Sequence, residues 1–254
     1  MKASGRITLG LILLLLAGLL LTVGANSWKS GLVVRKILVE GNRVVDANEI
    51  LQLAHVQPGM KLYDLDLMVI RRDVLSHYFL NSVLVERDLP STIRITVVER
   101  TPLAMVNRDG ILYLDQDGVV LPHQVSRELF DLPIVTGIPN TTRLAMGTTL
   151  KHPDIREALV ILSTAKAVSR ELYHLISEVC LREGGDIILY TAEEGIPVLF
   201  GRGHVSSKLV RLDTFWNSVV RERGIQDLEY IDLRYENQVV VRWKPSHRKV
   251  ASRS

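Results

Sequence analysis

The sequence of 254 residues contains one cysteine, Cys180, so no disulfide can form within the chain. The fold must therefore depend on its hydrophobic core alone. Cys180 lies in the apolar-flanked segment ISEVCLRE, and we interpret it as a small buried strand residue rather than as a nucleophile.

Signatures of catalysis are missing as well. The sequence has no H-E-x-x-H, C-x-x-C, G-x-S-x-G or Walker motif. GRGHVS at residues 201–206 has two glycines of a dinucleotide-binding loop but not the third, and we interpret it as a turn before a helix. The sequence thus predicts no metal, no cofactor and no enzymatic activity.

Positive charge is in small excess, with 31 Lys and Arg against 28 Asp and Glu, a formal net charge of +3. Such an even balance does not favour a nucleic-acid-binding protein. Basic residues gather without acids only at the end of the chain, at Lys244, Arg248, Lys249 and Arg253. Residues 245–254 are predicted to be a disordered basic tail, with contact to anionic lipid or glycan as the alternative.

A long uncharged run stands at the other end, from residue 7 to residue 25. At about 1.5 Å per residue, a helix of this run matches a hydrocarbon core of roughly 30 Å, which predicts a transmembrane helix. The alternative is a signal peptide cleaved after Ala25, and N-terminal sequencing would distinguish the two. Basic residues balance on the two sides, but residues 1–6 are too few to fold, so all folded parts are expected on one side of the membrane.

Residues 33–100 alternate between two kinds of periodicity. VVRKILVEGN predicts a strand, Asp46 and Glu49 resemble a capping box before a helix over residues 47–54, and QPGM ends that region. A second helix is predicted to carry one apolar face made of Leu67, Ile70, Val74 and Tyr78. SVLVERD and TIRITVVE then predict two strands separated by a turn with Pro90.

The second half, residues 101–244, predicts a mostly antiparallel β domain with flanking helices. ILYLD, GVVLP, DIILY and PVLF are short strands, and helices are expected at about residues 154–169 and after residue 205. In the later helix, the apolar stripe comprises Val205, Leu209, Leu212, Trp216 and Val219, and Lys208, Arg211, Arg221 and Arg223 lie off it. Gly224 is expected to end this helix.

YIDLRYENQVVVRWKP, residues 230–245, predicts a β-hairpin near the end of the chain. A three-residue loop, 236–238, would place Ile231, Tyr235 and Trp243 on one face and pair Asp232 with Arg242 on the other. Residues 238–243 are then expected to be an edge strand, whose open backbone groups another chain could pair with.

The order of several short motifs resembles that of one family. VEGN after the first strand of a β-α-α-β-β unit resembles a POTRA domain, and VERTPLA, LDQDGVVLP, DLPIVTG and IDLRYENQVVV resemble successive motifs of the FtsQ/DivIB family of bacterial cell-division proteins. The likeness runs from the apolar segment to about Trp243. The short N-terminal tail departs from the family pattern.

The resemblance implies a single-span scaffold of the divisome in the cell inner membrane at the division septum. Its N-terminus would be cytoplasmic and its C-terminal domain extracytoplasmic, and it would help to control septal peptidoglycan synthesis. The implied partners are bitopic coiled-coil proteins of the FtsB and FtsL type, bound by β-strand addition, and other division proteins bound through the POTRA domain.

Matching positions give the site residues that this resemblance implies. Arg234, Tyr235, Val240 and Trp243 would contact the strand-adding partner, and Val85 and Arg87 would serve recruitment through the POTRA domain. The alternative for the hairpin is that Tyr235 and Trp243 pack inside and the basic tail covers the edge. Alternatives for the whole chain are a POTRA-bearing secretion or outer-membrane assembly factor, disfavoured because no barrel-like strand series follows, and a signal-cleaved secreted cell-wall protein.

Overall fold

The computed structural model of the protein describes residues 14–22, 29, 31–108, 110–123, 130–182 and 184–244. These residues form an α+β structure that divides into two compact units, Met1–Arg100 and Thr101–Ser254. Of the predicted span, residues 7–25, the structure describes only residues 14–22, and these are helical. Within the described part, no helix combines the length and the apolar character that crossing a membrane requires.

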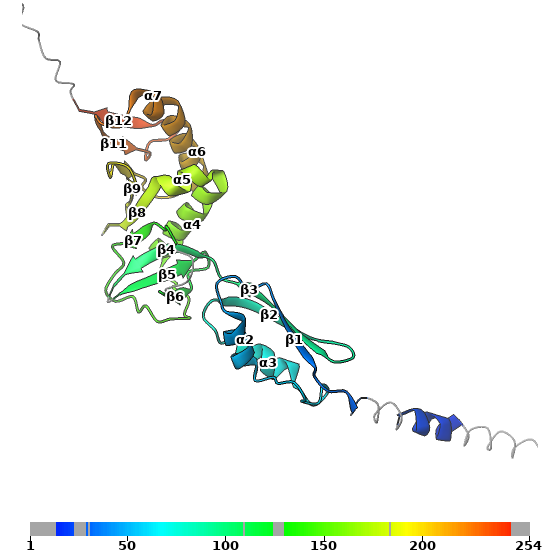
Figure 1. The fold of residues 1–254 in the computed structure, drawn as a ribbon. Coiled ribbons are helices and arrows are strands. Elements are labelled where there is room, and N and C mark those ends of the chain that lie inside the picture. Colours follow the sequence, from blue (N-terminus) through cyan, green and yellow to red (C-terminus); the bar gives the residue numbers. More distant parts are fainter. Residues whose placement is uncertain are drawn as a thin grey trace, which may run out of the picture. The chain divides into compact units, whose positions relative to one another are not determined.

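The first unit has the predicted β-α-α-β-β order (Figure 1). Its elements are β1 (Lys36–Glu40), α2 (Ala47–Ala54), α3 (Leu67–Val74), β2 (Leu80–Asp88) and β3 (Thr92–Glu99). β3 is the central strand, parallel to β1 and antiparallel to β2. The two long strands and the helix at 47–54 were thus predicted correctly.

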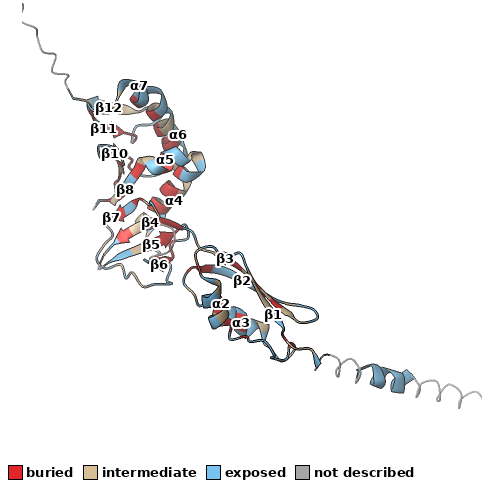
Figure 2. Cartoon of the chain, in the orientation of Figure 1, coloured by how far each residue is buried: buried red, intermediate tan, exposed pale blue. Residues whose placement is uncertain are grey.

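Burial alternates along much of β2 and β3, which Figure 2 colours by burial. Ile93 and Ile95 of β3 are fully buried, whereas Leu84 on the neighbouring strand is 54% exposed. Because successive strand residues point to opposite faces, one face of the sheet carries the core and receives the helices. Ile50 of α2 and Val74 of α3 are fully buried in that core.

Local polar contacts fix where the elements begin. Asp46 caps α2 by accepting a hydrogen bond from the Asn48 N–H at 2.7 Å. The Glu99 carboxylate at the end of β3 accepts hydrogen bonds from the backbone N–H groups of residues 43, 44 and 45 at 2.9–3.1 Å. Gly41 lies just before them with φ +88°, which a glycine adopts without steric cost. The turn after β1 is thus tied directly to the central strand.

One residue of the predicted helical face is placed differently. Tyr78 lies after the end of α3 and is 46% exposed, and its neighbour Phe79 is fully buried instead. The helix ends at Val74 because the chain turns through residues 75–79 into β2, so the i, i+4 step from Val74 no longer applies.

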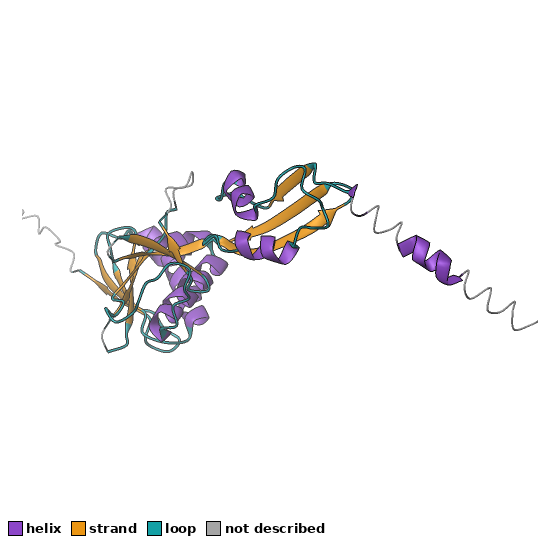
Figure 3. Ribbon diagram, turned by 90° about the horizontal axis from the view of Figure 1, so that it is seen from below, coloured by secondary structure: helices purple, strands orange, loops and turns teal. Residues whose placement is uncertain are grey.

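The second unit is built on one nine-stranded sheet, drawn in orange in Figure 3 with its helices in purple. Its strands are β4 (Pro102–Asn107), β5 (Ile111–Asp115), β6 (Val120–Pro122), β7 (Ile134–Thr136), β8 (Ile176–Leu181), β9 (Ile187–Thr191), β10 (Pro197–Leu199), β11 (Leu228–Asp232) and β12 (Val240–Trp243). Their order is β12-β11-β10-β9-β8-β7-β4-β5-β6. Five of the eight pairings are antiparallel, as predicted, and β11 with β10, β8 with β7, and β7 with β4 are parallel.

The helices of this unit cover part of the sheet. They are α4 (Pro153–Val168), α5 (Arg170–Leu175), α6 (Val205–Phe215) and α7 (Arg221–Arg223), and a π-helical turn, η1 (Trp216–Val220), joins the last two. α4 contacts β4, β8 and α6, and it contributes fully buried residues such as Ile155 and Leu162 to the core. The sequence did not predict α5, which follows α4 after a single residue, Ser169.

The π-helical turn changes the buried stripe of the last helix. Val220 is 3% exposed and Val219 is 36% exposed, the reverse of the predicted stripe, because the extra residue of a π turn shifts the helix by one position. Trp216 belongs to the core as predicted. Lys208, expected off the stripe, is 5% exposed, and its Nζ donates to the carbonyl oxygens of Phe200 and Arg202 at 2.8 and 2.7 Å.

Two smaller expectations also changed. Cys180 lies on β8 as predicted but is only partly buried. Gly224, with φ +88°, follows Arg223 and ends α7, as expected.

Candidate partner-binding edge

β12 is the last strand of the nine-stranded sheet, and its described pairing is with β11 alone. In a β-strand, the N–H and C=O of one residue point to one side, and those of the next residue point to the other. The Leu233 N–H donates to the Leu199 carbonyl of β10 at 3.0 Å, so the backbone groups of Leu233 and Ile231 point towards β10. The backbone groups of Tyr230 and Asp232 therefore point towards β12.

The residues opposite them define the open side of β12. Tyr230 pairs with Arg242 and Asp232 pairs with Val240, so the backbone groups of Val240 and Arg242 point inward. The Lys244 N–H also points inward, because it donates to the Asp227 carbonyl at 2.7 Å. The backbone N–H and C=O groups of Val241 and Trp243 consequently point away from β11. Among the residues that the structure describes, no strand pairs with that side.

The hairpin register differs from the predicted one by two residues. Asp232 lies opposite Val240 rather than Arg242, and Arg242 forms an ion pair with Glu229 at 3.1 Å. A shift of two keeps the side chains of the paired strands on their predicted faces, so Ile231 is still buried and Trp243 still packs against the core. The connection spans residues 233–239 instead of a three-residue loop.

Asp232 and Arg234 form a compact ion pair at the start of this connection. The Arg234 side chain donates to both Asp232 carboxylate oxygens, at 3.0 Å from Nε and 2.7 Å from Nη2, and its N–H donates to Oδ1. Burial alone would raise the pKa of Asp232, but the Arg234 hydrogen bonds outweigh it and leave that pKa below its ordinary value. The same hydrogen bonds raise the pKa of Arg234.

The guanidinium of Arg234 also lies beside a second carboxylate, that of Asp186. Its side chain is 45% exposed, and Asp186 Oδ2 lies 3.4 Å from Nη1. Gly201 packs directly against the stem, since a Cβ at that position would lie 2.9 Å from the Arg234 Cγ. The predicted contact residue is thus held in one orientation, with nearly half of its side-chain surface exposed.

The two predicted aromatic contacts have different environments. Tyr235 is 50% exposed and does not share the buried face that the sequence suggested. Trp243 is half-buried on the core, and the Arg223 guanidinium carbon lies 3.9 Å from its ring centroid. The alternative in which both aromatics pack inside is wrong for Tyr235.

Two arginines in contact with the hairpin were not predicted as functional residues. Arg211 Nη1 donates to the carbonyl oxygens of Tyr235 and Gln238 at 3.2 and 3.4 Å, and Arg223 stacks on Trp243. The sequence placed both arginines off the apolar stripe, but the π turn that lies between them leaves no recognisable pattern in the sequence.

The two residues predicted for recruitment are not freely exposed. Val85 is 7% exposed in the core of the first unit. Arg87 lies on the same face of β2, where Nε donates to the Leu62 carbonyl at 2.9 Å and Nη2 to the Leu65 carbonyl at 2.5 Å. Alternation along β2 places Val83, Val85 and Arg87 on the inner face of the sheet.

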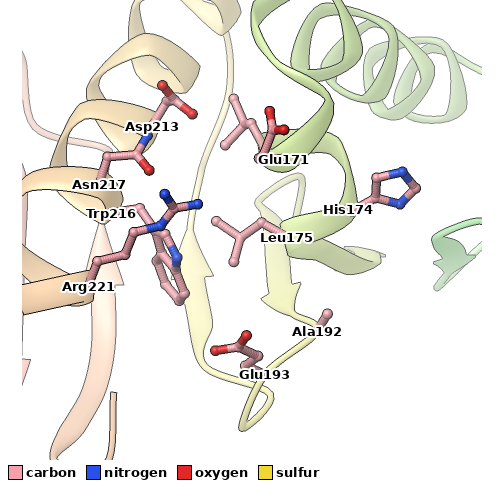
Figure 4. A pocket seen from close by; sticks show the side chains of 10 residues that line it. Glu171, His174, Leu175, Ala192, Glu193, Asp213, Trp216, Asn217 and Arg221 are labelled. Carbon is pink, nitrogen blue, oxygen red and sulfur yellow. The ribbon is translucent and has the colours of Figure 1, made fainter. Parts of the chain in front are cut away.

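A pocket of about 260 Å³ lies between α5, the turn after β9 and the η1 region (Figure 4). Trp216 and Leu175 form its apolar part, Glu171 and Glu193 lie at its rim, and Arg221 points into it beside Trp216. Arg221 therefore lines this pocket, whereas Arg211 and Arg223 of the same helical segment contact the hairpin.

Comparisons with known proteins agree with this two-part arrangement. Residues 32–100 match the model of the POTRA domain, FtsQ-type, and residues 104–234 match the model described as cell division protein FtsQ/DivIB, C-terminal. A POTRA unit followed by this β domain defines a class of bacterial cell-division proteins.

Relatives extend over most of the chain. Cell division protein FtsQ of Geobacter sp. (strain M21) is 32% identical, over 78% of this chain and 71% of the relative. The FtsQ proteins of Rhodothermus marinus and Salinibacter ruber are 30% and 28% identical, over 88% and 95% of this chain and 83% and 92% of the relatives.

This chain belongs to the FtsQ/DivIB family and is a cell-division protein of the divisome. The family is one of division scaffolds and not a known class of enzymes. Membership argues against the alternative of a POTRA-bearing secretion or outer-membrane assembly factor.

Proposed function

We propose that this protein is a single-span, non-enzymatic scaffold that receives a partner strand at β12. Residues 7–25 would anchor it in the cell inner membrane with the N-terminus in the cytoplasm and residues 33–244 outside it, at the septum. Its partners would be bitopic coiled-coil division proteins of the FtsB and FtsL type, and the assembly would help to control septal peptidoglycan synthesis.

The observation that carries this proposal is the open side of β12. Val241 and Trp243 direct backbone donors and acceptors away from β11, and a strand laid alongside would satisfy them. Side chains of the connection before β12 would then provide specificity. Arg234, whose side chain is 45% exposed, would pair with a partner carboxylate, and Tyr235 offers a large, half-exposed aromatic surface.

Removing the aromatic contacts tests this function. Tyr235→Ala and Trp243→Ala are each expected to weaken capture of the partner by about 30-fold or more, because truncated interface anchors lose about 2 kcal/mol or more. The measurement is co-purification of the full chain with its co-expressed coiled-coil partner, alongside circular dichroism of the folded chain. Tyr190→Ala, on β9 in the middle of the sheet, is the matched control. Undiminished capture by both folded variants would refute the assignment.

A second partner surface is proposed in the POTRA unit, where Val85 and Arg87 would act through the structure they build. Arg87 ties the loop containing Leu62 and Leu65 to β2, so its loss would release that loop rather than remove a surface contact.

Charge reversal at Arg87 tests this recruitment role. Arg87→Glu is expected to reduce midcell localisation of a fluorescent fusion several-fold, because a carboxylate cannot donate to the two carbonyl groups and would repel them. Arg72→Glu makes the same change at an arginine of α3 whose side chain is 73% exposed, and it serves as the control. Equal midcell localisation of the two variants would argue against the site.

A further inference from the structure

The last helical segment contacts the β11–β12 hairpin at two separate places. At the connection, Arg211 of α6 donates from Nη1 to the Tyr235 and Gln238 carbonyl oxygens at 3.2 and 3.4 Å. Its Nε donates to the Ser207 carbonyl at 3.2 Å, so the guanidinium is anchored on its own helix as well. One side chain thus holds together the two ends of the stretch 235–238.

At the far end of β12, Arg223 of α7 makes the second contact. Its guanidinium carbon lies 3.9 Å from the centroid of the Trp243 ring, and the Lys244 N–H donates to the Asp227 carbonyl just beyond. A guanidinium stacked on an indole restricts the rotation of both groups. Trp243 is therefore fixed between the core and this arginine.

The π turn explains how two arginines of one helix reach the same hairpin. Arg211 and Arg223 are twelve residues apart, and twelve residues of regular α-helix make about three and a third turns. Arg223 would then point about a third of a turn away from Arg211. The extra residue in Trp216–Val220 makes the spacing equivalent to eleven residues, about three full turns, so both arginines lie on one side of the helix.

We propose that Arg211 and Arg223 are positioning residues that hold the hairpin in the conformation that receives a partner strand, a proposal that rests on the proposed function. Residues 233–239 are a seven-residue connection without strand pairing, and an edge strand beside a loose connection would have to be ordered during binding. Contacts that order it beforehand improve affinity by lowering that entropic loss. Neither arginine needs to touch the partner.

Arg221 supplies a matched control on the same segment. It is exposed like Arg223, but it points into the pocket beside Trp216 (Figure 4). Arg221→Ala removes the same charge from the same helix, so any general effect of charge or helix propensity appears in both variants.

Binding and hydrogen exchange of the full chain in detergent test the proposal. Arg211→Ala and Arg223→Ala should each bind the purified coiled-coil partner about tenfold more weakly and the double variant about 100-fold, because distant sites add. Arg211→Lys, which keeps the charge with one donor head, should fall between Arg211→Ala and the unaltered protein. The inward-facing amides of β12, those of Val240 and Arg242, should exchange faster in the free variants, with protection in β8 and β9 unchanged. A saturating concentration of the partner should restore the protection of these hairpin amides.

Separate outcomes distinguish this proposal from the proposed function. If Tyr235→Ala and Trp243→Ala abolish capture while the double arginine variant binds and exchanges like Arg221→Ala, the positioning role is refuted and strand capture stands. If the aromatic variants bind normally, strand capture itself fails. Loss of protection throughout the second unit of the double variant would show a purely structural role and would also refute the proposal.

Discussion

Val241→Pro is expected to reduce partner capture by at least about 100-fold while the hairpin itself remains folded. Val241 directs its N–H away from β11, so proline at this position removes a donor that only a partner can use. The pyrrolidine ring also occupies the space beside the edge. A carbonyl left unsatisfied on the incoming strand would weaken the binding free energy by about 1–3 kcal/mol, and the steric overlap with the proline ring would weaken it further. Proline is tolerated on edge strands where its missing N–H would face outward.

Two companion variants make this result specific to the backbone. Val241→Ala keeps the N–H and removes only packing against the core, so it should capture the partner nearly as well as the unaltered protein. Val240→Pro removes an inward N–H and should loosen the pairing of β12 with β11, which hydrogen exchange at Asp232 would report. The comparison is made by co-purification and titration of the full chain. Equal affinities of Val241→Pro and Val241→Ala would mean that strand addition does not occur at this edge.

Gly41→Ala is expected to unfold the first unit selectively, by lowering its free energy of unfolding by about 3 kcal/mol or more. At this position φ is +88°, and a Cβ would lie 2.2 Å from the Val97 carbonyl oxygen. Val97 belongs to β3, the central strand of its sheet, which cannot move without breaking its pairing on both sides. Backbone strain and overlap with a fixed carbonyl therefore act together.

Gly59→Ala separates these two contributions. Gly59 has a similar φ of +94°, but no atom lies within 4 Å of the added Cβ, so only the strain of about 1 kcal/mol should appear. Hydrogen exchange across the full chain would show lost protection in β1 and β3 for Gly41→Ala, with protection in β8 and β9 retained. Midcell localisation should fail in that variant, whereas partner capture at β12 should persist. Equal stabilities of the two variants would contradict the packing argument.

The first unit could be predicted closely because local rules decided it. Asp46 marks the start of α2, and alternating β-branched residues mark β2 and β3, which is why their bounds were nearly right. The same alternation also predicts the inner-face position of Arg87, because Arg87 follows Val83 and Val85 at intervals of two residues.

The hairpin was harder because a non-local contact decides it. The pattern of apolar residues fixed the faces of β11 and β12 correctly, since a shift of two residues preserves them. It could not fix the register, because the connection 233–239 is held by Arg211 from a different element. The π turn at Trp216–Val220 likewise has no local signal, and it exchanged the expected positions of Val219 and Val220.

Hydrogen exchange at single amides, with and without the coiled-coil partner, tests the central claim most directly. In the free protein, the Val240 and Arg242 amides, which face β11, should exchange slowly, and the Val241 amide should exchange fast. Partner binding should slow Val241 by at least about 100-fold and change its two neighbours little. Strong protection of the Val241 amide before any partner is added would show that the chain already covers this edge, and would contradict the account.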